Sequence, residues 1–194
     1  MTKPLMVHVI TNFAGVGGAE MMLARLIQCT EQQYKHVIIA LMKTSEVYQS
    51  TLDRCQAHYA LDWNGINTLG TVSKLRTLLK KLQPATVQCW MYHANVLTSL
   101  SIIGLAQKPK VVWGIHHSLA SPKDESISTK IALALSKILS QQASAIIYCA
   151  HSSMQQHQAF GFKNGNSQVI ANGVFLDKFQ PNLQLNQPTV IGFA

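Results

Sequence analysis

Seven short runs of apolar, often β-branched residues recur along the chain, and helix-like segments separate most of them. The runs cover residues 5–11, 36–42, 57–61, 86–91, 110–116, 144–150 and 168–172. They are continuous rather than alternating, which is typical of strands buried on both faces of a parallel sheet. Strands that alternate with helices favour right-handed βαβ units. The pattern therefore predicts an α/β fold with a doubly wound, mainly parallel sheet flanked by helices.

The segment 71–82 separates apolar and basic residues on two faces of a predicted helix. The apolar face is formed by Val72, Leu75, Leu78, Leu79 and Leu82, and the basic residues outside it are Lys74, Arg76, Lys80 and Lys81. Two interpretations remain open. The apolar face can pack against the sheet with the lysines in solvent, or the helix can rest on anionic lipid headgroups. Similar helix patterns cover residues 19–29, 94–106 and 128–142.

Length and composition indicate a globular chain with one well-buried domain. The 194 residues are 47% apolar and 12% charged, and the length is short for two domains. The four cysteines are widely scattered without a CxxC pair, which argues against a zinc site and a disulfide framework. No secretory signal is recognisable, and the longest nearly apolar run, 95–106, is too short to span a bilayer. We expect a soluble, cytoplasmic protein.

The net charge of +8 arises from 16 lysines and arginines against 8 acidic residues. Such an excess favours a polyanionic neighbour, either phosphorylated ligands or an anionic membrane surface, although it can also be a solvated surface charge. Nucleic acid is not expected as a partner, because the basic residues are dispersed and no aromatic-rich or zinc-finger pattern accompanies them.

A glycine-rich segment, "GVGGAE", follows the first apolar run and precedes a helix pattern. Its small residues, Gly15, Gly17 and Gly18, let backbone amides approach a phosphate at the N-terminus of the helix. Glu20 stands where a dinucleotide fingerprint needs glycine or alanine, and no GK[ST] follows. The segment therefore predicts a phosphate cradle other than a nicotinamide or Walker site, unless it is only a tight turn.

Other polar residues follow the fourth, fifth and sixth apolar runs, where ligands bind in open α/β sheets. His116 and His117 end the fifth run and can contact a sugar hydroxyl or stabilise charge on a leaving phosphate. A structural role at the strand end is the alternative, and it also applies to His93 after the fourth run. Ser152 and Ser153 are predicted N-caps of the next helix, because no GxSxG elbow surrounds them.

Three segments together resemble a bacterial glycosyltransferase of family 4. They are "GVGGAE" at 15–20, "WGIHHS" at 113–118 and "GFKNGNSQVIANGVFLDKFQP" at 161–181. In the last of these, Asp177 and Phe179 fit the family pattern, whereas Phe175 stands where family members commonly carry an acid. The family has the GT-B architecture, in which two Rossmann-like domains face each other across a cleft. The resemblance covers essentially the whole chain but only the N-terminal half of such an enzyme.

The resemblance implies how the chain is divided. Residues 1–180 are expected to form the N-terminal, Rossmann-like, acceptor-side domain. Residues 181–194 are expected to be an interdomain linker and the first strand of a C-terminal donor-binding domain that is missing from this chain.

The resemblance also implies an activity and a set of roles. The complete enzyme is expected to be a hexosyltransferase that moves a sugar from a nucleoside-diphosphate sugar to a glycan or lipid-linked acceptor, with retention and without metal or other cofactor. Cell-surface polysaccharide or lipopolysaccharide biosynthesis, at the inner face of the cytoplasmic membrane, is the expected setting. Gly15, Gly17, Gly18 and Glu20 are expected at the donor, His116 at the donor sugar with His117 as its substitute, and His93, Asn95 and Ser152 at the acceptor. The chain alone is expected to be inactive, and a non-catalytic module that binds a phosphorylated ligand is the alternative.

Overall fold

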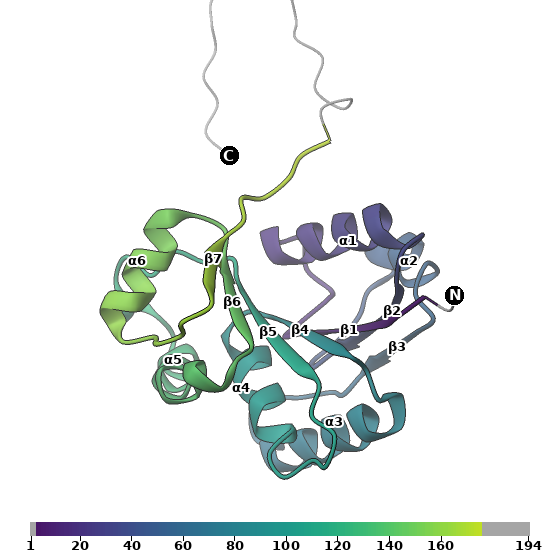
Figure 1. Ribbon diagram of the computed structural model, residues 1–194, viewed down its shortest axis with the longest axis horizontal. Coiled ribbons are helices and arrows are strands. Elements are labelled where there is room, and N and C mark those ends of the chain that lie inside the picture. Colours follow the sequence, from purple (N-terminus) through teal and green to yellow (C-terminus); the bar gives the residue numbers. More distant parts are fainter. Residues whose placement is uncertain (1–2, 176–194) are drawn as a thin grey trace, which may run out of the picture.

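The computed structural model describes residues 3–175, which form one sheet with helices on both faces (Figure 1). The strands are β1 (Leu5–Ile10), β2 (Lys35–Ala40), β3 (Ala57–Ala60), β4 (Thr86–Trp90), β5 (Lys110–Ile115), β6 (Ala145–Tyr148) and β7 (Ser167–Val169). The longer helices are α1 (Gly18–Thr30), α3 (Thr68–Leu82), α4 (Tyr92–Ser101), α5 (Ile127–Leu139) and α6 (His151–Phe160). Short helical turns are α2 (Gln49–Leu52), η1 (Glu46–Tyr48), η2 (Pro122–Asp124) and η3 (Ser140–Gln142).

The sheet has seven strands in the order β3-β2-β1-β4-β5-β6-β7, and every neighbouring pair is parallel. The predicted doubly wound α/β class is confirmed. The chain moves outward from β1 to β3 and then returns to pair β4 with the other side of β1. This reversal creates a switch point between the carboxyl ends of β1 and β4, where open α/β sheets bind their ligands.

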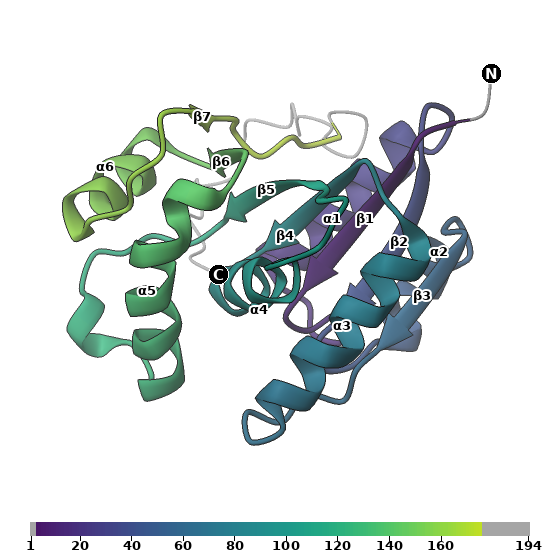
Figure 2. The same cartoon turned by 60° about the horizontal axis from the view of Figure 1, so that its bottom comes forward.

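The two faces of the sheet are covered unequally. One core cluster joins α3, α4, α5 and α6 to inward residues such as Val9, Val87 and Trp113. The other joins α1 and α2 to the opposite face through Ile10, Ile38 and neighbouring residues. Figure 2 shows α3, α4 and α5 side by side on the first face.

The packing of α3 decides whether its apolar face lies against the sheet or is free to rest on lipid headgroups. Leu75 and Leu79 are buried, and Val72, Leu78 and Leu82 pack against the same core cluster. Lys74, Lys80 and Lys81 are exposed. Arg76 donates to the carbonyl of Ser101, so it also joins α3 to the end of α4. The apolar face of this helix therefore packs on the sheet and is not available to a lipid surface.

The predicted N-caps at Ser152 and Ser153 are wrong. Ala150 occupies the N-cap position of α6, without a side-chain hydrogen bond, and both serines lie inside the first turn. The Ser153 hydroxyl donates instead to the carbonyl of His117, at 2.8 Å. Ser153 thus ties α6 to the loop after β5.

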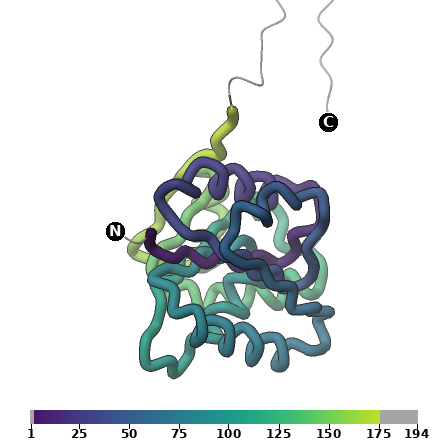
Figure 3. Tube along the Cα trace, turned by 90° about the vertical axis from the view of Figure 1, so that its right-hand side faces the viewer, coloured from purple at the N-terminus to yellow at the C-terminus, as the bar shows by residue number. Residues whose placement is uncertain are grey.

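The last described residues leave the sheet along α1. After β7, the Arg25 guanidinium of α1 donates to the carbonyl of Gly173, at 2.7 Å. Figure 3 shows the yellow end of the described chain rising out of the body beside the N-terminal segments. The matching Asp177 and Phe179, the predicted helix after the Asn-Gly turn, and the predicted linker at 181–194 lie outside the described residues. Within residues 3–175, no helix combines the length and apolar character needed to cross a bilayer.

Candidate functional site

A cleft of about 420 Å³ lies at the switch point of the sheet. It is lined by Ile10, Thr11, Asn12, Gly18, Ala19, Glu20, Met91, Tyr92, His93, His116, His117, Glu125 and Thr129. These residues come from the ends of β1, β4 and β5 and from the starts of α1, α4 and α5. Five of the nine predicted site residues line this cleft, namely Gly18, Glu20, His93, His116 and His117.

The glycine loop forms the β1 side of the cleft. Gly17 is the N-cap of α1, and no side chain caps the amides of the first turn. The Tyr48 hydroxyl donates to the carbonyl of Gly15, at 3.0 Å, and its ring stacks on Phe13 at 4.2 Å. The loop is therefore anchored from behind by an aromatic pair, and uncapped amides remain at its helix end.

The Glu20 carboxylate folds back over Gly17. A Cβ atom at position 17 would collide with the Oε2 atom of Glu20, whereas positions 15 and 18 have open space. Glycine at position 17 thus lets the Glu20 carboxylate approach the backbone closely, and its φ of −122° is one that any residue can adopt. Negative charge at a helix N-terminus is favourable. The Glu20 carboxylate therefore occupies part of the predicted phosphate-binding site.

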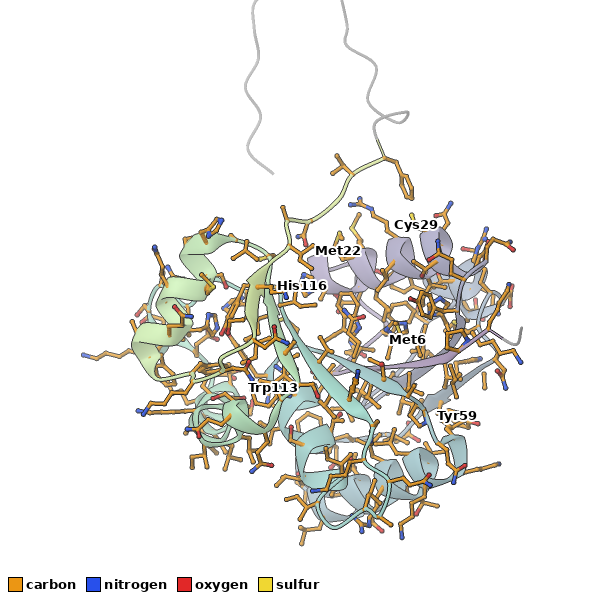
Figure 4. The ribbon with its side chains drawn as sticks, viewed as in Figure 1. Met6, Met22, Cys29, Tyr59, Trp113 and His116 are labelled. Carbon is orange, nitrogen blue, oxygen red and sulfur yellow. The ribbon has the colours of Figure 1, made fainter. Side chains whose placement is uncertain are left out.

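His116 stands at the end of β5, close to Met22 of α1 (Figure 4). Its ring stacks on Trp90 with centroids 4.9 Å apart and an interplanar angle of 14°. The Asn172 Oδ1 atom lies 3.3 Å from Nδ1 and accepts its proton. Burial lowers the pKa of His116, and the Asn172 hydrogen bond opposes that shift. The neutral ring therefore keeps Nε2 as an acceptor.

A buried chain of hydrogen bonds holds Trp90 beneath His116. The Trp90 indole donates to His8 Nδ1 at 3.4 Å, and His8 Nε2 lies 3.0 Å from His36 Nδ1. His36 Nε2 lies 3.1 Å from the Thr30 hydroxyl, which donates to the Leu26 carbonyl. Because an indole can only donate, a single placement of protons, with both imidazoles protonated on Nε2, satisfies the chain.

Met91 lies between this series of hydrogen-bonded side chains and the cleft, and its backbone conformation is strained. Its φ of 74° and ψ of 167° lie in a region that only glycine adopts readily. Met91 follows Trp90 at the end of β4, lines the cleft and is the N-cap of α4. Strain of this kind persists where the surrounding contacts fix the backbone, and it clusters at functional sites.

His117 forms a close pair with Glu125. The His117 Nε2 atom lies 2.7 Å from the Glu125 Oε1 atom, and both residues line the cleft. A carboxylate can only accept, so His117 carries a proton on Nε2. A histidine oriented by a carboxylate can move a proton or hold a hydroxyl group.

A second buried pair supports this wall. The Tyr92 hydroxyl lies 2.6 Å from His157 Nε2, and His157 Nδ1 donates to the Ser153 carbonyl at 2.7 Å. Burial raises the pKa of Tyr92 above its usual value, and it lowers the pKa of His157. Both groups therefore stay neutral, with the tyrosine donating to the histidine.

The remaining predicted residues lie apart from the cleft wall. Asn95 is fully buried in α4, and both polar atoms of its amide lack a partner among residues 3–175. Ser152 is exposed on α6, and neither it nor Gly15 and Gly17 is among the residues that line the cleft. His93 lines the cleft beside Trp63, with ring centroids 5.1 Å apart, and burial lowers its pKa.

Glu125 and Trp90 are parts of this site that the sequence interpretation missed as functional groups. Trp90 ends the fourth strand, whose carboxyl end was already a predicted ligand-binding edge, so its position was a usable signal. Glu125 lies in a loop eight residues beyond His117, and no spacing rule connects the two.

A separate cavity of about 350 Å³ lies at the opposite edge of the sheet, between the end of α3 and the loop before β5. Its charged lining residues are Lys80 and Lys108, and no histidine or acid faces it. Within residues 3–175, no three histidine, cysteine, aspartate or glutamate side chains gather as a metal site would require. The predicted site residues that converge are therefore those that line the cleft at the switch point.

Solved structures share this fold. The lipopolysaccharide outer core galactosyltransferase WaaB, in its apo form, gives a TM-score of 0.70 at 14% identity, over 95% of this chain and 50% of WaaB. HepE from Anabaena, in complex with UDP-glucose, gives 0.68 at 16% identity, over 89% of this chain and 45% of HepE. UDP-N-acetylglucosamine 2-epimerase from Rickettsia bellii gives 0.61 at 13% identity, over 88% of this chain and 45% of the epimerase.

These similarities establish the architecture and not the reaction, because transferases and an epimerase share it. The chain spans about half the length of the structures that it matches. Its sheet therefore corresponds to half of a GT-B fold. No curated protein matches the chain significantly.

The family is established by sequence. The profile of Glycosyltransferase Family 4 matches residues 16–178, which include the glycine loop at Gly17, the histidine pair and Asn172. The chain belongs to Glycosyltransferase Family 4.

Proposed function

We propose that this chain is the acceptor-side domain of an enzyme that transfers a sugar from a nucleoside-diphosphate sugar to a glycan or lipid-linked hydroxyl group. The observation that carries the proposal is the position of His116. It stands in a cleft at the switch point of the sheet, opposite the uncapped N-terminus of α1. A second, donor-binding domain would complete the cleft.

A uridine nucleotide is the first donor to test. HepE was solved with UDP and with UDP-glucose, and WaaB is a galactosyltransferase. Both share the fold of this chain, and the chain belongs to Glycosyltransferase Family 4. UDP-hexoses are therefore the donors that we propose.

The cleft offers groups suited to the departure of a diphosphate. Negative charge grows on the leaving group, and the amides of Gly18 and Ala19 at the start of α1 are placed to stabilise it. The Glu20 carboxylate must turn away from Gly17 when an anion arrives, and it can then accept a sugar hydroxyl. His116 Nε2 would contact the donor sugar.

The acceptor would enter along the opposite wall of the cleft. His93, Thr129 and the His117–Glu125 pair line this side. We propose that these groups orient the acceptor hydroxyl, and that transfer retains the anomeric configuration without a metal ion, as the family resemblance implies. Asn95 and Ser152 remain proposals for the acceptor side that the cleft geometry does not support.

The test has two parts. Titration of the chain with UDP-glucose, followed by NMR, should move the amide signals of Gly17, Gly18 and His116. Sequence of the gene beyond the codon for Ala194 should encode a second domain in frame, and the two-domain protein should transfer sugar in a screen of UDP-hexoses. A stop codon directly after Ala194, together with nucleotide binding but no turnover, would favour a non-catalytic module that binds a phosphorylated ligand.

A further inference from the structure

The helix α5 presents apolar residues on two opposite faces. Leu133, Ser136 and Leu139 are buried against α4 and the sheet. On the other side, large apolar side chains are exposed at intervals of four, four and three residues. Their exposed fractions are 78% at Ile127, 57% at Ile131, 38% at Leu135 and 70% at Ile138.

This spacing places the four side chains on one stripe. At 100° per residue, positions 127, 131, 135 and 138 fall within about 80° of arc, and the exposed Ala134 lies about 20° beyond one side of it. Single exposed apolar residues are ordinary on protein surfaces, whereas a contiguous row along a helix marks an interaction surface. We call Ile127, Ile131, Leu135 and Ile138 the α5 stripe.

The charges on the helix that carries the α5 stripe have one sign. Lys130 and Lys137 are exposed on the same flank of the stripe, whereas the segment before the helix is mixed, with Lys123 followed by Asp124 and Glu125. The helix contains no acidic residue, and the whole chain carries a net charge of +8. An apolar stripe flanked by lysines is the pattern of helices that lie in the interface of an anionic bilayer.

The α5 stripe lies next to the cleft. Glu125 and Thr129, which flank the first residue of the stripe, line the cleft from the start of α5. The Ser126 hydroxyl caps this helix by accepting from the Thr129 amide, at 3.2 Å, so the end beside the cleft is fixed. A partner surface that binds the α5 stripe would therefore lie beside the wall of the cleft at which we propose that the acceptor binds.

We infer that the α5 stripe docks the protein on an anionic lipid surface. Its isoleucines would lie at the boundary between headgroups and acyl chains, and Lys130 and Lys137 would lie among the headgroups. This assigns the membrane contact to α5 instead of α3, whose apolar face is buried. Docking in this orientation brings the cleft to the membrane, which deepens the proposed function because it specifies a lipid-linked acceptor. The docking itself does not depend on transferase activity.

The experiment is co-sedimentation of the chain with vesicles of phosphatidylcholine alone or with about 30% phosphatidylglycerol, an anionic lipid. Ile131→Ser with Ile138→Ser should reduce binding to the anionic vesicles about tenfold. Lys130→Gln with Lys137→Gln should reduce it about fivefold or more, and only on the anionic vesicles. Ile103→Ser, at the other edge of the sheet, and Lys74→Gln with Lys80→Gln on α3 are the matched controls and should bind as the unchanged chain does.

Two results would overturn the inference. One is equal sedimentation of the unchanged chain and the α5 variants, with far-ultraviolet circular dichroism confirming that all are folded. The other is a dimer in light scattering that Ile131→Ser with Ile138→Ser converts to monomer, because the stripe would then bind a second copy. In the two-domain protein, loss of vesicle binding by the α5 variants with intact transfer to a water-soluble acceptor would support the docking and leave the proposed function standing. Absence of transfer by the unchanged two-domain protein, with intact docking, would contradict only the proposed function.

Discussion

His117 and Glu125 form a hydrogen-bonded pair in the wall of the cleft, with Nε2 and Oε1 2.7 Å apart. The carboxylate fixes which nitrogen of the imidazole carries the proton, and it leaves Nδ1 to face other partners. The pair therefore gives His117 a defined orientation that a lone histidine in a loop would lack.

Glu125→Gln should remove this control. The amide has a donor of its own and holds the imidazole less firmly, so we expect both tautomers of His117 to appear in nitrogen-15 NMR spectra of the chain. In the two-domain enzyme the turnover number should fall about 10- to 100-fold with little change in the KM for the donor. Glu46→Gln, at an exposed position on η1, is the control. An unchanged tautomer and an unchanged rate would show that the pair is only structural.

Gly17→Ala should disturb the glycine loop, because the new methyl group would occupy the space of the Glu20 carboxylate. We expect Glu20 to be displaced, a loss of about 1 kcal/mol in the free energy of unfolding, and weaker binding of UDP-glucose. Gly15→Ala and Gly18→Ala meet open space and should be tolerated. Calorimetric titration checks the binding, and equal effects at all three positions would contradict the proposed close contact.

Met91→Gly should be more stable than Met91→Ala. Both variants lose the same side-chain packing, but only glycine accepts a φ of 74° with a ψ of 167° without strain. We expect a difference of about 1 kcal/mol in urea denaturation. Met154, inside α6, is the matched control, since glycine should there be about 1 kcal/mol worse than alanine. The same sign at both positions would refute strain at Met91.

Acid should destabilise the fold through His8. Burial, together with the nearby His36, lowers the pKa of His8 from 6.5 to about 3. Between these values the unfolded chain binds the extra proton, so stability falls as the pH drops below 6.5 and continues to fall until about pH 3. At pH 5 the loss from His8 alone is about 2 kcal/mol.

The pKa of His36 is also lowered by burial, and its hydrogen bond and Glu31 oppose that shift. Both histidines therefore lower the free energy of unfolding as the pH falls. His8→Gln should flatten the dependence of unfolding free energy on pH between 7 and 5, while His58→Gln, exposed on β3, should leave it unchanged. Denaturation by urea at both pH values makes the comparison, and parallel slopes for all three proteins would refute the assignment.

His8 also connects stability to the site. It accepts the indole proton of Trp90, on which His116 stacks. No sequence rule predicts this relation, since His8 reads as a polar interruption in a buried strand. Parallel pairing of β1 with β4 places His8 opposite Gln88 and thereby brings it beside Trp90.

The sequence by itself determined the alternation of strands and helices, the α/β class and the edge of the sheet at which polar residues gather. Continuous apolar runs and amphipathic periods are local patterns, and the handedness of βαβ connections leaves few ways to assemble them. The family followed from the same local segments, at the glycine loop, the histidine pair and the turn at Asn172. The tertiary structure alone decided which face of each helix is buried, so that α3 covers its leucines while α5 leaves Ile131 and Ile138 in solvent. It also decided that Glu125 meets His117 and that Asn95 turns into the core, because such contacts depend on how elements pack in space and not on spacing along the chain.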